Sequence, residues 1–136
     1  MLVTGGGGSI GKELCLQIAA FSPACLIIVE NSEYNLYAID LKLRQQFPQL
    51  PLQSVLCSVT DKPGITSIFN RFCPDIIFHA AAYKHVPLLE SQIRTAVYNN
   101  VVGTRILAEA AVACGTSMFI LISTDKAVNP ANIMGA

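Results

Sequence analysis

A chain of 136 residues has the length of about one domain. Hydrophobic residues make up 52% of it and charged residues 13%, which excludes intrinsic disorder and suits a sheet that is buried on both faces. The net charge of +0 gives no electrostatic reason to expect binding to nucleic acid or to an acidic membrane surface, and no apolar run approaches the ~20 residues of a membrane span.

Short runs of strand-forming residues alternate with helical stretches along the whole chain. The pattern predicts strands at 1–4, 26–29, 52–56, 75–79 and 118–123, with helices between them at 9–20, 33–46, 62–72 and 88–113. Strand–helix alternation at this spacing predicts right-handed crossovers and a parallel sheet. We therefore expect an α/β fold.

Capping residues support two of these helices. Asn31 or Ser32 is placed to cap the helix at 33–46. Thr60 and Asp61 precede the helix at 62–72, and Pro63 is tolerated in its first turn. These helix starts are expected from local chemistry alone.

The cysteines are few and widely spaced. They are odd in number, form no C-x-x-C pair, and are Cys15, Cys25, Cys57, Cys73 and Cys114. We interpret them as small buried hydrophobic residues of a protein in a reducing cytoplasm. No cluster of histidine and cysteine has metal-ligand spacing, so we expect no metal.

The first strand runs into a glycine-rich loop with the spacing T-G-x-x-G-x-x-G. In such a loop Gly5 permits a tight turn, Gly8 allows the backbone close to a pyrophosphate, and Gly11 allows close packing of the helix that follows. The helix start at Ser9 and Ile10 offers free N–H groups to phosphates. The alternative is a flexible turn. Strand, loop and helix together predict an NAD(P)-binding Rossmann fold, a doubly wound parallel sheet truncated after strand five.

Glu30 stands at the end of the second strand, where an acidic residue is expected to bind the adenosine ribose. Its carboxylate would accept a hydrogen bond from a 2′-hydroxyl and repel a 2′-phosphate. No arginine is adjacent, so the sequence favours NAD, with NADP as the alternative. The other interpretation of Glu30 is a solvated loop residue.

Polar residues also follow strands four and five, where ligands bind in open parallel sheets. After strand four, the small side chains of Ala80, Ala81 and Ala82 would let the chain pass beneath a cofactor, while Lys84 and His85 could face a phosphate or sugar.

After strand five, Thr124, Asp125 and Lys126 offer a hydroxyl, a carboxylate and an amine suited to proton transfer. The alternative for Asp125 and Lys126 is an exposed, self-paired turn. His79 ends an apolar strand and is expected to be a core histidine.

Four motifs in chain order resemble those of the extended short-chain dehydrogenase/reductases, in the polysaccharide-biosynthesis (CapD-like) branch of nucleotide-sugar 4,6-dehydratases. They are Thr4-Gly-x-x-Gly-x-x-Gly11, His79-Ala-Ala-Ala-Tyr-Lys-His-Val-Pro87, Asn100-Val-x-Gly-Thr104 and Ser123-Thr-Asp-Lys-Ala-Val-Asn-Pro130. The resemblance covers the whole chain. The motifs after strands four and five are specific to the branch, whereas the glycine loop is shared by many reductases.

The resemblance implies an intramolecular redox elimination on a UDP-N-acetylhexosamine, with UDP-N-acetylglucosamine expected. Hydride passes from sugar C4 to bound NAD(P)⁺ and returns to C6 after water is lost, so the cofactor is regenerated. By similarity, Lys126 would be the C5 base, Asp125 the acid for the leaving hydroxyl, and Thr124 a hydrogen-bond partner of the C4 oxygen. A lysine base requires a pKa lowered by burial or a nearby cation. Asn100 matches a position that supports the active site, or is a helix-start cap.

Two positions depart from the family pattern. Ser58 and Val59 follow Cys57 where the family has Gly-Asp-Val, so the adenine contact falls to a hydroxyl or the backbone. Met134 occupies the place of the catalytic tyrosine of Y-x-x-x-K and cannot ionise. Some large members of the branch are similar in carrying methionine there. The paired lysine would fall two residues beyond Ala136.

We therefore expect residues 1–136 to be a partial NAD(P)-binding Rossmann domain, without its substrate domain and without turnover alone. The alternatives are an epimerase or reductase on the same fold, or an inactive dinucleotide-binding module. The expected partner is a nucleotide sugar, and a homo-oligomer is left open. We expect a cytoplasmic domain, whether or not a parent protein carries a membrane anchor, as some relatives do.

Overall fold

Five strands form one parallel sheet in the order β3-β2-β1-β4-β5. The computed structural model describes residues 1–130, 132 and 134. The strands are β1 (Leu2–Thr4), β2 (Leu26–Glu30), β3 (Leu52–Leu56), β4 (Ile76–His79) and β5 (Met118–Leu121). This order confirms the predicted Rossmann-type sheet, because the chain winds outward from β1 in one direction to β3 and then in the other to β5.

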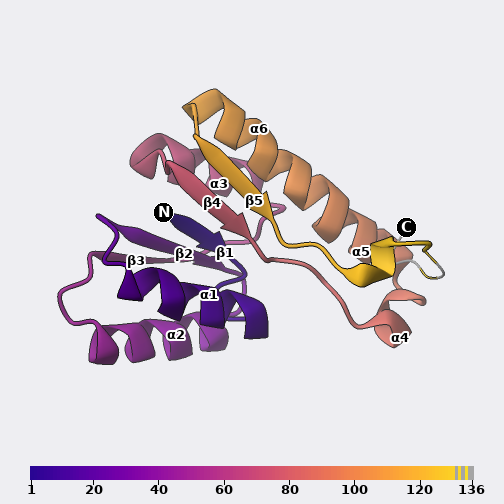
Figure 1. Cartoon of the computed structure of the whole chain (residues 1–136). Helices are drawn as coiled ribbons and strands as arrows, with labels where there is room; N and C mark the ends of the chain where they lie inside the picture. The colour runs from indigo at the N-terminus through magenta and orange to yellow at the C-terminus, as the bar shows by residue number, and fades with distance from the viewer. Residues whose placement is uncertain (131, 133, 135–136) are drawn as a thin grey trace.

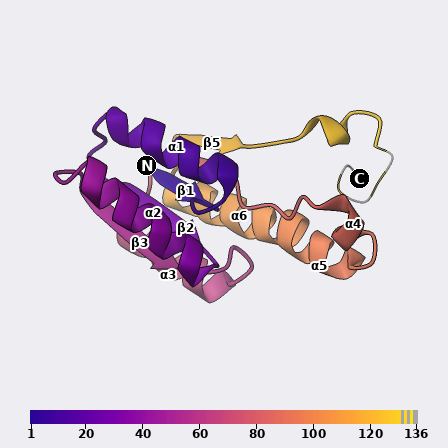
Figure 2. The same ribbon diagram turned by 90° about the horizontal axis from the view of Figure 1, so that it is seen from below.

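Helices cover the two faces of the sheet in separate layers (Figures 1 and 2). One face is covered by α1 (Ser9–Ala20) and α2 (Glu33–Gln46), and the other by α3 (Lys62–Phe72) and α6 (Thr104–Cys114). Each layer has its own apolar cluster. Val3 and Ile28 belong to the cluster with α1 and α2, whereas Ile27 and Ile77 belong to the cluster with α3 and α6. Alternate residues of each strand therefore supply opposite cores.

The predicted helix starts are confirmed where a local cap defines them. Ser32 caps α2 through its hydroxyl, which accepts a hydrogen bond from the backbone N–H of Asn35 at 3.4 Å. Asp61 caps α3 in the same way and accepts from the N–H of Gly64 at 3.2 Å. The bounds of α1, α2 and α3 agree with the sequence prediction.

The helix predicted over 88–113 is wrong as one continuous element. The chain instead forms α4 (Val86–Leu89), α5 (Ile93–Val97), a π-helical segment η1 (Tyr98–Gly103), and then α6. The Ser91 hydroxyl donates to the carbonyl of Leu88 at 3.0 Å, a local bond that competes with helix continuation. The π turn η1 is hydrogen-bonded to the loop after β4, and the periodicity of the sequence does not predict contacts of that kind.

Several strand ends differ from the prediction by one or two residues. β1 begins at Leu2 and β4 at Ile76, each one residue later than predicted, while β2 includes Glu30 and β5 ends at Leu121 instead of at 123. Ile122 still donates to the carbonyl of His79 at 3.0 Å, after which the chain leaves the sheet.

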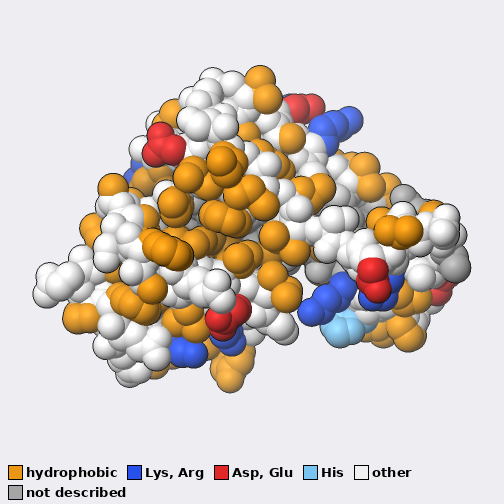
Figure 3. Space-filling model, viewed as in Figure 1, with side chains coloured by type: hydrophobic (Ala, Val, Ile, Leu, Met, Phe, Trp, Pro, Cys, Tyr) orange, Lys and Arg blue, Asp and Glu red, His pale blue; other side chains and the backbone are white. Residues whose placement is uncertain are grey.

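Apolar side chains lie exposed in the centre of the face seen in Figure 3, and Met118 of β5 is 52% exposed.

The cysteine interpretation is wrong for one pair. Cys73 and Cys114 are joined in a disulfide, although 41 positions separate them. Consecutive crossovers place the ends of α3 and α6 side by side, a neighbourhood that spacing in the sequence does not show. Cys15 is a buried free thiol, and burial raises its pKa to about 12.

Among the described residues, no helix is both long and apolar enough to cross a membrane.

Candidate functional site

A cavity of about 140 Å³ lies at the carboxyl ends of β1, β2 and β4, where the order of the strands reverses. Crevices at such switch points are the usual ligand sites of open α/β sheets. The cavity is lined by Gly5, Gly8, Val29, Glu30, Asn31, Asn35, Cys57, Val59, Ala80, Ala81, Ala82, Tyr83 and Asn99. Six of the predicted cofactor-binding positions at the first, second and fourth strand ends are thus brought together, with Val59 from the loop after β3.

The glycine loop forms the floor of this cavity, and the steric reason for having glycine differs between its positions. Gly5 has φ +65°, and a Cβ there would lie 2.7 Å from the carbonyl oxygen of Ala80. A Cβ on Gly11 would overlap the carbonyl oxygen of Gly5, so α1 packs directly on the loop itself. Gly8 lines the cavity, and a Cβ added there would meet only the carbonyl oxygen of Gly5, at 3.3 Å.

The amino end of α1 adjoins the loop without a side-chain cap. Gly8 is the N-cap residue and provides no side-chain hydrogen bond to the first turn. Ser9 and Ile10, the next two residues, are exposed and are not among the residues lining the cavity. Free N–H groups at a helix start favour an anion.

Glu30 is held rigidly at the edge of the cavity. Its Oε2 accepts from the backbone N–H of Gly7 at 3.0 Å, and its Oε1 accepts from those of Asn31 and Ser32, each at 3.0 Å. The side chain is 7% exposed, which rules out the solvated loop residue considered from the sequence. The carboxylate thus links the glycine loop to the start of α2 and places a negative charge beside the cavity.

Of two consecutive asparagines in η1, Asn99 lines the cavity and Asn100 does not. Asn100 accepts from the N–H of Tyr83 and donates to its carbonyl, both at 2.9 Å. Asn99, 6% exposed, donates from Nδ2 to the carbonyl of Ala81 at 3.3 Å and to Oδ1 of Asn100 at 2.9 Å. These bonds tie the π turn to the loop after β4. Asn100 therefore is not a helix-start cap, since it lies inside a continuous helical segment.

Sequence reasoning missed several lining residues. Asn99, Tyr83 and Asn35 come from three separate segments and line the cavity together. Asn99 directly precedes the motif that begins at Asn100, so the pair of adjacent asparagines was the sequence signal that could have identified it as a site residue. Asn35 lies in the first turn of α2 and had no sequence signal of its own, because its position follows from how α2 packs beside the glycine loop.

His79 is a core residue, as predicted. Its Nδ1 lies 2.6 Å from the Thr4 hydroxyl and its Nε2 lies 2.8 Å from the Thr104 hydroxyl. Thr104 in turn donates to the carbonyl of Asn100 at 2.6 Å. The ring is 2% exposed, and burial lowers its pKa to about 4. This network joins β1, β4 and α6 behind the cavity rather than facing it.

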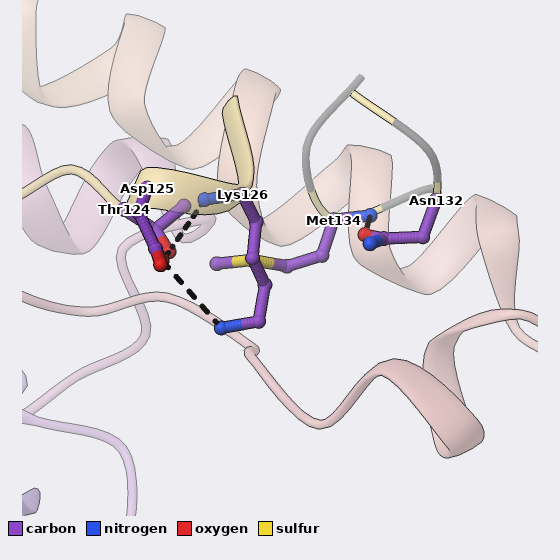
Figure 4. Close-up of polar contacts among 5 residues, drawn as sticks. All are labelled: Thr124, Asp125, Lys126, Asn132 and Met134. Carbon is purple, nitrogen blue, oxygen red and sulfur yellow. Dashed lines mark hydrogen bonds and ion pairs between the residues drawn. The ribbon is translucent and has the colours of Figure 1, made fainter. Parts of the chain in front are cut away.

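The residues after β5 form a separate surface turn (Figure 4). Thr124 caps the short 3₁₀ helix η2 (Asp125–Ala127); its hydroxyl accepts from the N–H of Lys126 at 3.3 Å and donates to Asp125 Oδ1 at 3.2 Å. Lys126 Nζ lies 3.9 Å from the same oxygen, with the side chains 46% and 95% exposed. This is the self-paired turn considered as the alternative, and none of the three residues lines the cavity.

The other predicted positions also lie outside the cavity lining. Ser58 hydrogen-bonds Thr60 at 2.8 Å, between the two hydroxyl oxygens. Lys84 and His85 are exposed. The backbone N–H of Met134 donates to Asn132 Oδ1 at 3.1 Å, and its side chain extends toward Lys126 in Figure 4. The described residues contain no group of three or more side chains able to hold a metal ion.

Known proteins resemble this chain over its whole length. The chain is 44% identical to the probable polysaccharide biosynthesis protein EpsC of Bacillus subtilis and 43% identical to the capsular polysaccharide biosynthesis protein CapD of Staphylococcus aureus. Both alignments cover 100% of this chain and 23% of the relative. A UDP-N-acetylglucosamine 4,6-dehydratase (inverting) of Campylobacter jejuni is 30% identical, over 100% of this chain and 39% of the relative. The chain thus spans well under half of each relative's length.

Solved structures share the fold. Pen from Bacillus thuringiensis superposes with a TM-score of 0.88 at 26% identity, over 98% of this chain and 40% of that one. A DesIV double mutant (dTDP-glucose 4,6-dehydratase) from Streptomyces venezuelae, solved with NAD bound, gives 0.80 at 24% identity, over 98% of this chain and 46% of that one. The second likeness shows the fold alone.

One family accounts for the strand order, the glycine loop and the sequence likeness together. The family described as polysaccharide biosynthesis protein matches residues 1–136. This chain belongs to that family.

Proposed function

We propose that this chain binds NAD in the cavity at the switch point and is the dinucleotide-binding part of a nucleotide-sugar 4,6-dehydratase. The observation that carries the first half is the position of Glu30, buried and fixed by three backbone N–H groups beside a glycine loop. The second half rests on the relatives. One of them is named as a UDP-N-acetylglucosamine 4,6-dehydratase, and two are polysaccharide biosynthesis proteins.

The residues present fit a dinucleotide. Gly5 and Gly11 leave no room for a Cβ, and Gly8 keeps the cavity side of the loop open, which are the requirements of close backbone approach to a pyrophosphate. The uncapped start of α1, at Ser9 and Ile10, would supply N–H donors to it.

Glu30 would accept from the ribose hydroxyls with whichever lone pairs its three backbone donors leave free. Val59 and the alanines 80–82 would contact the rings, and Ser58 and Asn100 would act from the surrounding wall. When bound, the nicotinamide supplies reversible hydride acceptance.

The residues after β5 carry the proton chemistry of the proposal. The structure pairs Lys126 with Asp125 on an exposed turn, so these roles require the substrate to separate the pair. Lys126 would then take a proton from sugar C5, Asp125 would give one to the departing 6-hydroxyl, and Thr124 would hydrogen-bond the oxygen on C4. All three lie on one turn, within reach of one another. Lys84 and His85, on the exposed loop after β4, would meet the phosphates or sugar of a UDP-N-acetylhexosamine. Met134 at the tyrosine position supplies no ionisable group.

Cofactor choice is the part of the proposal that this chain can test directly. Calorimetric titration should give tighter binding of NAD than of NADP, because a 2′-phosphate would meet the Glu30 carboxylate. Glu30→Ala should narrow the difference. Glu30→Gln is the milder variant, since it removes the charge and keeps one acceptor oxygen, although its NH₂ group faces the backbone N–H that the other carboxylate oxygen binds in the unmodified protein. Tighter NADP binding by the unmodified protein would overturn the proposal.

Turnover is proposed to need more chain than these residues. Mass spectrometry should detect no loss of water from UDP-N-acetylglucosamine with residues 1–136 alone, and a dehydrated product would refute this. In a longer protein that turns over, Lys126→Ala should stop exchange of the C5 hydrogen with deuterated solvent. Continued exchange would remove Lys126 as the base.

An epimerase or reductase on the same scaffold is the second candidate, since the fold alone does not separate these reactions. The adjacent acid and amine at Asp125 and Lys126 favour an elimination, because a simple reductase has no leaving group to protonate. A module that only binds dinucleotide is the third. Product analysis of the longer protein separates these outcomes.

A further inference from the structure

Two cysteines that the proposed function does not use lie together at the ends of neighbouring helices. Cys114 is the last residue of α6, and Cys73 follows α3 directly as its C-cap residue. Their Cα atoms are 5.7 Å apart, and the two residues are joined in a disulfide. This Cα separation is within the range that an S–S bond spans without movement of the backbone.

We propose that Cys73 and Cys114 are a reversible thiol–disulfide pair, a modification site that reacts with small disulfides and thiols of the glutathione class. The pair lies on the outer side of the α3/α6 layer and lines a cavity of about 510 Å³ between those helices. Cys73 is exposed and Cys114 is half-buried. Cys73 is therefore the sulfur that an incoming small disulfide can reach, and Cys114 is the resolving partner.

The chemistry balances with one oxidant. The Cys73 thiolate attacks a sulfur of oxidised glutathione, one S–S bond forms as another breaks, and one glutathione thiolate leaves. The Cys114 thiolate then attacks Cys73 Sγ and displaces the second glutathione. The protein loses two electrons and two protons, and the oxidised glutathione becomes two molecules of the reduced thiol. Excess dithiothreitol reverses both exchanges.

The remaining cysteines do not share this geometry. Cys15, Cys25 and Cys57 are free thiols. Cys15 is fully buried beneath the glycine loop, where a Cβ on Gly6 would lie 3.2 Å from its Sγ. Cys25 and Cys57 are half-buried and belong to different ends of the sheet, one before β2 and one after β3. Oxidation is thus expected at one pair alone.

The disulfide should act on stability and leave the ligand site unchanged. It precedes β4 and β5, at the amino-end edge of the sheet, whereas the cavity of the glycine loop lies at the carboxyl ends. It joins the two helices whose apolar residues share one core, including Phe69 of α3 and Leu107 of α6. Closing a loop with a sequence separation of 41 should raise the Tm by about 10 °C.

The first test counts thiols in the unmodified 136-residue chain. After incubation with oxidised glutathione and unfolding in maleimide, mass spectrometry should show three alkylated cysteines, and five after dithiothreitol. Peptide mapping should find one cross-link, Cys73 to Cys114. Five alkylated cysteines in the oxidised sample, or a cross-link elsewhere, would overturn the proposal.

The second test measures the consequence by thermal denaturation. Dithiothreitol should lower the Tm of the unmodified protein by about 10 °C and have no such effect on Cys73→Ser or Cys114→Ser. Cys25→Ser is the matched control and should respond as the unmodified protein does. An equal Tm in both redox states of the unmodified protein would refute the stabilising role without any variant. NAD affinity, measured separately, should change by less than about twofold, so the result is independent of the proposed function.

Discussion

Protonation of His79 should make the stability of this fold fall in mild acid, because the ring is buried with both nitrogens already bonded. Thr104 donates its hydroxyl proton to the carbonyl of Asn100, so its oxygen can only accept from His79 Nε2–H. Nδ1 must then be the unprotonated nitrogen, and it accepts from the hydroxyl of Thr4. The neutral Nε2–H tautomer satisfies every group in the network.

The magnitude follows from the difference between the folded and unfolded states. Burial lowers the pKa of His79 from 6.5 to about 4. Between these values the unfolded chain binds the proton and the folded chain does not, so stability is full above pH 6.5 and falls as the pH drops toward 4. The loss attributable to His79 is about 2 kcal/mol at pH 5 and about 3 kcal/mol at pH 4.

Urea denaturation followed by circular dichroism at pH 7, 6, 5 and 4.5 measures this loss. Carboxylates also titrate in the range, so the informative quantity is the difference between the unmodified protein and His79→Gln at each pH. The difference should shrink by about 2 kcal/mol from pH 7 to pH 5, because only the unmodified protein carries the buried ring.

NMR measures the protonation of His79 independently of stability. The chain has two histidines, so a His85→Gln variant leaves a single imidazole signal, that of His79. It should not titrate above pH 5. Parallel stability curves for the unmodified protein and His79→Gln, or titration of the remaining signal near pH 6.5, would refute the account of a neutral buried ring.

Three further substitutions separate folding from binding. Gly11→Ala should lower stability by about 1–3 kcal/mol in urea denaturation, because its Cβ would overlap the carbonyl oxygen of Gly5. Gly8→Ala, whose Cβ meets only one oxygen at 3.3 Å, should retain stability within about 1 kcal/mol yet weaken NAD binding in calorimetry by roughly tenfold; equal effects of the two variants would contradict the separate roles. Asn100→Ala should lower stability by about 1 kcal/mol in urea denaturation, because it removes two hydrogen bonds to the backbone of Tyr83 at an exposed position; unchanged stability would contradict this contribution.

Local chemistry accounts for the parts of the fold that the sequence predicted well. The helices at 9–20, 33–46 and 62–72 have the predicted bounds, because a glycine loop or a capping side chain defines where each begins. The parallel sheet follows from the alternation of strands and helices, since right-handed crossovers leave few topologies. The glycine loop and Glu30 were likewise recognisable, because both occur at fixed offsets from the first strand.

Contacts between distant segments decided the rest. The π turn exists where Asn99 and Asn100 bond the loop after β4, and the Cys73–Cys114 pair exists where two crossovers end side by side. The sequence placed Lys126 among chemistry-bearing residues, and the fold shows it paired on an exposed turn.

Residue types and spacing therefore determined the class of fold, the family resemblance and the dinucleotide loop. The helix starts and the loop depend on interactions within a few residues, and the resemblance rests on short motifs. Which side chains face the cavity, which cysteines meet and where the helix after β4 takes its π turn were decided only by tertiary structure. Those outcomes depend on the relative placement of segments that are 17 to 75 positions apart in the chain.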